Sequence, residues 1–232
     1  MKELNKLKLT KIRENIVQYV ELINLELEFK DEKAITALVR MSGFPYLKTF
    51  EDFYFTFQST IKKEEIMDFK NLRFIENKEN ILFVGSPEVG KTHLATSTGM
   101  EAAKNRYSTY FISCHDLIAN LKKANYENRL YDKIRNYEKY SVFIIDEVGY
   151  LPLDIEGANL LFQLINKRYE KHSTIITTNK PIGQWGELFG DNMIANAILD
   201  RLIHHSHIIN INGNSYRIKN KIKLDSEESE SI

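Results

Sequence analysis

Short apolar runs alternate with longer amphipathic stretches along most of this chain. The apolar runs are continuous, which is typical of strands buried on both faces of a parallel sheet. Candidate strands cover residues 81–84, 109–112, 141–145, 174–178 and 207–211. A helical pattern covers residues 155–170, and residues 113–139 hold two charged, tyrosine-rich helices. Because strands and helices alternate, the sequence predicts an α/β fold with a five-stranded parallel sheet and right-handed crossovers.

The residues before the first strand have a helical pattern. Apolar positions at helical spacing predict one helix over residues 4–28 and a second over 31–42, which ends at Gly43. The Phe44-Pro45 pair stops the helical region, because the residue before a proline disfavours helical dihedral angles.

An aromatic stretch at residues 48–55 is predicted to be an extended linker that packs on the core, and a helix is predicted over 61–75. We therefore divide the chain into a helical N-terminal region (1–47), an α/β core (48–217) and a charged tail (218–232). The tail has few apolar residues and a run of like charges, which predicts disorder.

Composition narrows the class of protein. The chain has 232 residues, of which 43% are hydrophobic and 11% aromatic, so it can build one substantial core. Cys114 is the only cysteine, which excludes a disulfide within the chain and a cysteine-based zinc cluster. A chain with a single cysteine fits a reducing cytoplasm. No apolar run reaches the length of a membrane span, so we expect no membrane partner.

The charge balance gives little direct support for nucleic-acid binding. The formal net charge is zero, whereas phosphate binding favours excess positive charge. The charges are unevenly distributed, however. Residues 1–13 are mainly basic and residues 225–230 are mainly acidic, so the body without its tail is modestly basic.

A phosphate-loop motif follows the first predicted strand and opens a predicted helix. Its pattern G-x-x-x-x-G-K-[ST] places backbone N–H groups around phosphates, a lysine on the β- and γ-phosphates and a hydroxyl on Mg²⁺. The alternative is a glycine-containing turn with an incidental lysine. The candidate nucleotide-binding residues are Gly85, Ser86, Pro87, Glu88, Val89, Gly90, Lys91, Thr92 and His93, with Thr92 as a Mg²⁺ ligand.

Two carboxylates end the third predicted strand, where ligands bind in parallel sheets. Asp146 is expected to hold Mg²⁺, and Glu147 to orient and deprotonate the attacking water. The alternative is a solvated acidic turn. Asn179 follows the fourth strand and is a candidate sensor of the γ-phosphate, or else a turn-forming asparagine before Lys180-Pro181.

Several stretches in the second half of the chain carry a family resemblance. They are residues 145–154, 156–165, 173–181, 185–186 and 197–206. Together they resemble the IstB-like family, the ATP-binding helper proteins of bacterial insertion sequences, which sits beside helicase loaders and the initiator DnaA among the AAA+ ATPases. The resemblance covers about residues 44–218, and its Gly149–Asp154 and Asp200–Ser206 stretches are specific to insertion-sequence helpers.

The resemblance implies a fold, an activity and partners. It implies an AAA+ P-loop core without a C-terminal helical lid, ATP hydrolysis with Mg²⁺, and homo-oligomers that assemble on double-stranded DNA and engage a transposase. Arg201 matches the arginine finger of related ATPases, and the alternative is an arginine that pairs with Asp200 or Glu187 on a helix surface. The helices within 113–139 match a DNA-contacting insertion, or are ordinary solvated helices. The candidate phosphate contacts there are Lys122, Lys123, Arg129, Lys133 and Arg135.

Two other functions stay open at this level: a helicase loader, and a nucleotide-gated DNA-binding scaffold with little hydrolysis. Glu88 favours the scaffold, because the family usually has glycine there. The N-terminal region also lacks the arginine-rich helix that the resemblance leads us to expect. His204, His205 and His207 are not expected to bind a metal, because no carboxylate or cysteine completes the set at ligand spacing.

Overall fold

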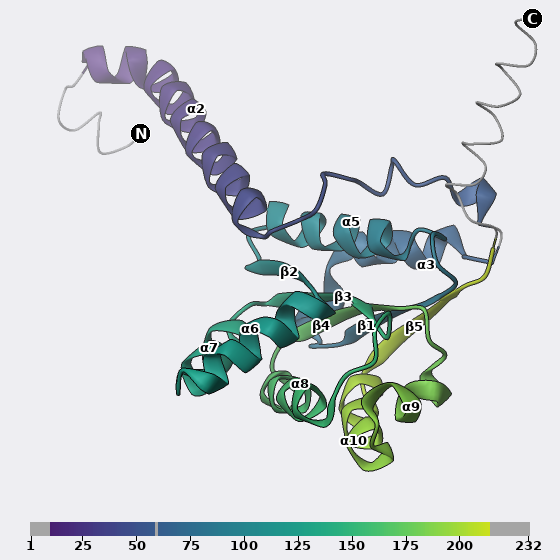
Figure 1. Ribbon diagram of the computed structural model, residues 1–232. Coiled ribbons are helices and arrows are strands. Elements are labelled where there is room, and N and C mark those ends of the chain that lie inside the picture. Colours follow the sequence, from purple (N-terminus) through teal and green to yellow (C-terminus); the bar gives the residue numbers. More distant parts are fainter. Residues whose placement is uncertain (1–9, 59, 214–232) are drawn as a thin grey trace, which may run out of the picture.

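A five-stranded, all-parallel sheet forms the centre of the computed structural model, which describes residues 10–58 and 60–213 (Figure 1). The strand order is β2-β3-β4-β1-β5. The bounds are β1 Asn80–Gly85, β2 Thr109–Ser113, β3 Val142–Val148, β4 Ser173–Thr178 and β5 Ser206–Ile211. Every predicted strand is present, which confirms the α/β fold. The predicted tail and most of the basic segment 1–13 lie outside the described residues.

Each face of the sheet buries one set of alternating strand residues. In β1, Ile81 and Phe83 join a cluster with Leu94 of α5, whereas Leu82 and Val84 join the cluster on the other face. Helix α5 (Lys91–Lys104) lies on the first face together with α3 (Lys63–Asp68) and α4 (Arg73–Glu76). The other face carries α6 (Cys114–Tyr126), α7 (Leu130–Glu138), α8 (Ile155–Arg168), α9 (Trp185–Phe189) and α10 (Asn192–Ile203).

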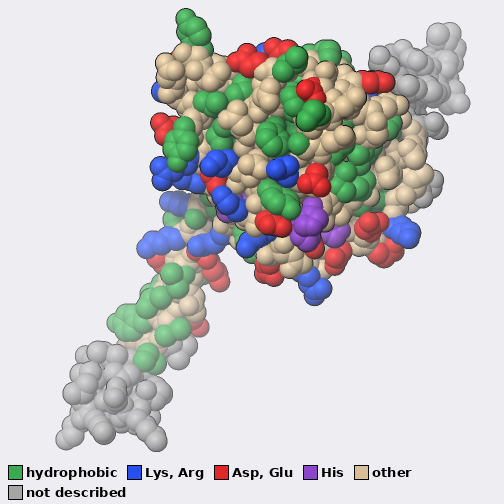
Figure 2. All heavy atoms as spheres, turned by 90° about the horizontal axis from the view of Figure 1, so that it is seen from below, with side chains coloured by type: hydrophobic (Ala, Val, Ile, Leu, Met, Phe, Trp, Pro, Cys, Tyr) green, Lys and Arg blue, Asp and Glu red, His purple; other side chains and the backbone are tan. Residues whose placement is uncertain are grey.

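The N-terminal region differs from the prediction. Helix α2 runs without a break over Thr10–Met41, so the predicted division between residues 28 and 31 is wrong. No glycine or proline occurs within it, and the first stop signal is Gly43. The helix extends away from the body, with exposed apolar side chains along it (Figure 2). It is not apolar enough to span a membrane, nor is any other helix of the described residues.

The single helix predicted over 61–75 is also wrong. Helix α3 passes into a 3-10 turn at Phe69–Asn71, and Leu72 then adopts a left-handed conformation with φ 57° before α4. Helices α9 and α10 were not predicted. The signal for α10 was present: Asp191 caps its N-terminus, and Ala195, Ile198 and Leu202 are buried at helical spacing.

Candidate active site

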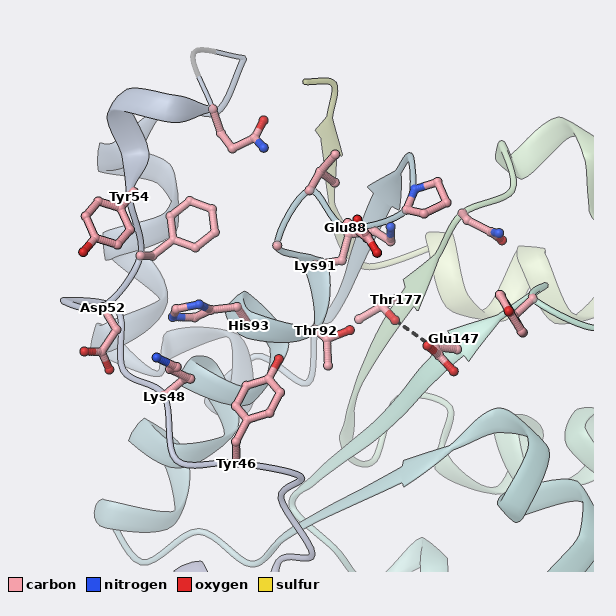
Figure 3. A pocket seen from close by; sticks show the side chains of 17 residues that line it. Tyr46, Lys48, Asp52, Tyr54, Glu88, Lys91, Thr92, His93, Glu147 and Thr177 are labelled. Atoms are coloured by element: carbon pink, nitrogen blue, oxygen red, sulfur yellow. Dashed lines mark hydrogen bonds between the residues drawn. The ribbon is translucent and has the colours of Figure 1, made fainter. Parts of the chain in front are cut away.

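The phosphate loop lines a cavity of about 740 Å³ at the carboxyl end of β1 (Figure 3). That volume is typical of small-molecule sites. The loop residues from Pro87 to Thr92, together with His93, face this cavity. Glu147 faces it from β3 and Asn179 from the position directly after β4. The structure therefore brings together the predicted loop, the second acidic residue and the predicted sensor, which are separated by up to about ninety residues of sequence.

Two residues of the phosphate loop have left-handed backbone conformations, which also occur in anion-binding backbone nests. Glu88 has φ 63° and Gly90 has φ 99°, both in the left-handed region. A Cβ atom at Gly90 would lie 2.5 Å from Cε2 of Phe53, so glycine is required there for space as well as for conformation. At position 88 a glutamate holds a conformation that glycine adopts more readily.

Lys91 is folded onto its own loop. Its ammonium donates hydrogen bonds to the carbonyl oxygens of Gly85 at 2.8 Å and Ser86 at 2.6 Å. Burial lowers the pKa of Lys91, while the charges of Asp146 and Glu147 raise it. A triphosphate in the cradle would offer this ammonium stronger, charged acceptors than two carbonyl oxygens.

Asp146 is held by two hydroxyl groups. Thr92 Oγ1 donates to its carboxylate at 3.0 Å, and Thr177 Oγ1 donates to Oδ1 at 2.5 Å. The side chain is 7% exposed, and burial raises its pKa, although these two hydrogen bonds lower it. Thr92 and Asp146, predicted as Mg²⁺ ligands, are thus in direct contact.

Glu147 lies on an irregularity of β3. The β3–β4 register shifts between Ile145 and Val148, and Glu147 has φ 61°, an uncommon value for a residue with a side chain. Its N–H donates to Thr177 Oγ1 at 2.9 Å (Figure 3). The bulge turns the exposed Glu147 carboxylate toward the cavity, whereas in a regular strand this side chain would point to one face of the sheet. Such backbone strain is typical of functional sites.

Thr177 is a positioning residue that the sequence analysis missed. One hydroxyl of this residue, 1% exposed, accepts from the Glu147 backbone and donates to Asp146. It therefore fixes the relative position of the two acidic residues. The available signal was its place near the end of β4, two residues before Asn179.

Asn179 lies in the cavity as predicted. Its Oδ1 atom is buried and has no hydrogen-bond partner among the described residues. A buried amide oxygen normally has a partner, so its lack of one here favours contact with a bound ligand.

The predicted linker forms the second wall of the cavity. The cavity is lined opposite the phosphate loop by Lys48, Asp52 and Tyr54 of this linker and by Tyr46 just before it (Figure 3). None of the four was predicted as a site residue. His93 anchors the linker, because its Nε2 lies 2.9 Å from the carbonyl oxygen of Thr49. Burial lowers the pKa of His93. The predicted packing of this linker on the core is confirmed, whereas the domain boundary after residue 47 stays a prediction.

Arg201 is far from the phosphate loop of its own chain. Its guanidinium donates to Asn166 Oδ1 at 2.7 Å and to the Ala197 carbonyl at 2.9 Å, so it pairs with neither Asp200 nor Glu187. Its backbone carbonyl lies 3.5 Å from the Asn80 side chain, at the start of β1. The phosphate loop follows the other end of β1, roughly 16 Å away at 3.3 Å per residue.

The five predicted DNA contacts lie on α6, α7 and the turn between them, and three are engaged within the chain. Lys122 pairs with Asp154 at 2.5 Å, Arg129 pairs with Glu127, and the Lys133 ammonium lies 4.9 Å from the Tyr137 ring centre. No ion pair within the described residues involves Lys123 or Arg135, and both are exposed.

Comparisons with known proteins place these features in a family. Residues 8–224 match the family described as IstB-like ATP binding protein. The chain is 52% identical, over 90% of its length and 83% of the relative's, to a protein of insertion sequence IS232 from Bacillus thuringiensis that is named as ATP-binding. It is 48% identical to the corresponding protein of IS5376 from Geobacillus stearothermophilus, over 86% and 80% of the two chains.

Solved structures agree with the fold. The DnaC helicase loader superimposes with a TM-score of 0.55 at 28% identity, over 64% of this chain and 87% of that one. AMPPCP-bound DnaA from Aquifex aeolicus gives a TM-score of 0.60 at 21% identity, over 79% and 56% of the chains, which shows a shared fold. The chain belongs to the IstB-like ATP binding protein family and is a P-loop ATPase of the AAA+ type.

Proposed function

We propose that this chain is an ATP-dependent helper of transposition that assembles on duplex DNA and regulates or recruits a transposase. The observation that carries the proposal is the nucleotide site, with its loop, acidic pair and buried amide, in a chain whose relatives belong to insertion sequences. We expect a transposase gene beside the gene for this chain, and its product would be the partner. A helicase loader is the second candidate, favoured by the structural likeness to DnaC, and a replication operon around the gene would support it.

The site suits Mg²⁺-dependent hydrolysis of ATP. Thr92 and Asp146 supply the oxygen ligands that Mg²⁺ prefers, and their contact at 3.0 Å marks where the ion would be held. A bound ion would neutralise charge on the phosphates. Lys91 would hold the β- and γ-phosphates, Asn179 would contact the γ-phosphate, and Glu147 would accept the proton of the attacking water.

The left-handed backbone at Glu88 leads to the first prediction. Glu88→Gly should tighten ATP binding about threefold to thirtyfold, or roughly 0.7–2 kcal/mol, because glycine relieves the strain and removes a negative charge near phosphates. Titration calorimetry with ATP and Mg²⁺ measures the change.

Glu88→Gln separates the two causes, since it removes the charge and keeps the side chain at φ 63°. If the glycine variant binds ATP no more tightly than the wild type, the carboxylate at position 88 makes a contact that compensates for its strain and charge.

DNA binding through phosphates is the second prediction. Lys123→Ala with Arg135→Ala should weaken binding of all duplex sequences alike and reduce the slope of log affinity against log salt by about 2, one unit for each phosphate contact. These two residues are chosen because Lys122→Ala would also release Asp154, which caps α8. Fluorescence anisotropy with the full chain, ATP and two unrelated duplexes measures the effect.

The matched control removes two exposed lysines from the opposite face of the sheet, Lys62→Ala with Lys104→Ala. It should leave the salt slope unchanged. Equal slopes for the wild type and the Lys123 and Arg135 variant would remove α6 and α7 from the DNA interface.

A further inference from the structure

Two histidines and a glutamate converge outside the nucleotide cavity. Glu170 Oε1 lies 3.8 Å from His204 Nδ1 and 3.9 Å from His205 Nε2, and the three ligand atoms all lie within 4.8 Å of one another. We propose that these side chains form a binding site for a transition metal ion of the zinc class. The carboxylate that the sequence analysis could not find for the histidines comes from Glu170, on a different segment.

The spacing fits an ion with little rearrangement. Ligand atoms about 2.0–2.2 Å from a tetrahedral Zn²⁺ lie about 3.4 Å apart. The distances from Glu170 to His204 and to His205 are within about half an ångström of that spacing. All three side chains are roughly half-exposed and can rotate. Exposure also leaves room for water in the fourth position. Figure 2 shows histidine and acidic side chains close together on one face of the molecule.

The backbone that carries these side chains is fixed. Glu170 has φ 57°, a left-handed conformation that a glutamate seldom adopts. Glu170 lies two residues after Arg168, whose buried guanidinium donates hydrogen bonds to the carbonyl oxygens of Tyr137, Tyr140 and Ser173. The His205 carbonyl accepts from the Asn80 N–H at 2.8 Å. The turn after α8 and the turn after α10 therefore hold their ligand side chains together.

The donor set selects the class of ion. Imidazole nitrogen suits Zn²⁺, Cu²⁺ and Ni²⁺, whereas Mg²⁺ and Ca²⁺ prefer oxygen ligands. The site would thus be distinct from the Mg²⁺ position at Thr92 and Asp146. Tyr169 Oη lies 2.8 Å from His204 Nδ1, so its hydroxyl competes with the ion for that nitrogen. A bound ion would join the turns after α8 and α10, the two helices that Arg201 links through Asn166.

Calorimetric titration of the full, untagged chain with ZnCl₂ tests the proposal. The wild type should bind one ion, and MgCl₂ at the same concentration should give no heat from this site. Glu170→Gln and His205→Asn should each weaken Zn²⁺ binding by at least about tenfold. Both variants should keep the wild-type circular dichroism spectrum and ATP affinity, which shows that they fold.

Two controls make the test specific. Tyr169→Phe removes the competing hydroxyl and should bind Zn²⁺ as tightly as the wild type or more tightly. His115→Ala removes an exposed histidine on α6 and should not change binding. Absence of Zn²⁺ binding by the wild type, or wild-type affinity in the Glu170 and His205 variants, would overturn the proposal.

Discussion

Glu147→Gln should keep ATP binding and reduce turnover by about two to four orders of magnitude. The glutamine keeps the shape of the side chain, its place on the β3 bulge and its backbone bond to Thr177, but it cannot accept the proton of the attacking water. Binding persists because the phosphate loop and Lys91 are unchanged. Phosphate release and ATP titration on the same preparation measure the two effects separately.

Thr177→Val is the informative companion to this variant. It removes the hydroxyl that positions both acidic residues but keeps the Glu147 carboxylate as a base, so turnover should fall by less than in Glu147→Gln. Normal turnover in Glu147→Gln would mean that a different group is the base, and the assignment would be wrong.

Arg201→Ala should reduce turnover by about a thousandfold or more, the range typical of arginine fingers. Arg201 lies at the start of β1 and the phosphate loop follows its end, so a finger role for Arg201 requires the ATP site of a neighbouring subunit. Steady-state turnover measured across protein concentrations reports the loss and its dependence on assembly.

Mixing variants tests whether the finger acts between subunits. Arg201→Ala subunits keep an intact loop and Lys91→Ala subunits keep an intact finger, so a one-to-one mixture should restore turnover at up to about one quarter of the head-to-tail interfaces. A chain that carries both substitutions, mixed with either single variant, is the control and should restore none. No rescue at any ratio, with co-assembly shown by light scattering, would contradict a finger supplied in trans.

Local patterns were enough to identify the fold class and the main chemistry. The phosphate loop, the acidic pair near the end of β3 and the alternation of strands with helices each depend on residues that are close in sequence, and each is present in the structure. The same reasoning was wrong at α2, where it divided a helix that contains no glycine or proline. It was also wrong at Leu72, where the chain turns left-handed although the residue is not a glycine.

The tertiary structure decided which separate pieces meet. The strand order places the carboxyl ends of β1, β3 and β4 side by side, so that Thr177 reaches Asp146 from 31 residues away. The linker packs against the core and lines the same cavity. It also joins Glu170 to two histidines that the sequence left without a carboxylate. A sequence pattern records the periodicity of one segment, whereas these contacts depend on strand register, a β-bulge and the packing of side chains from distant segments.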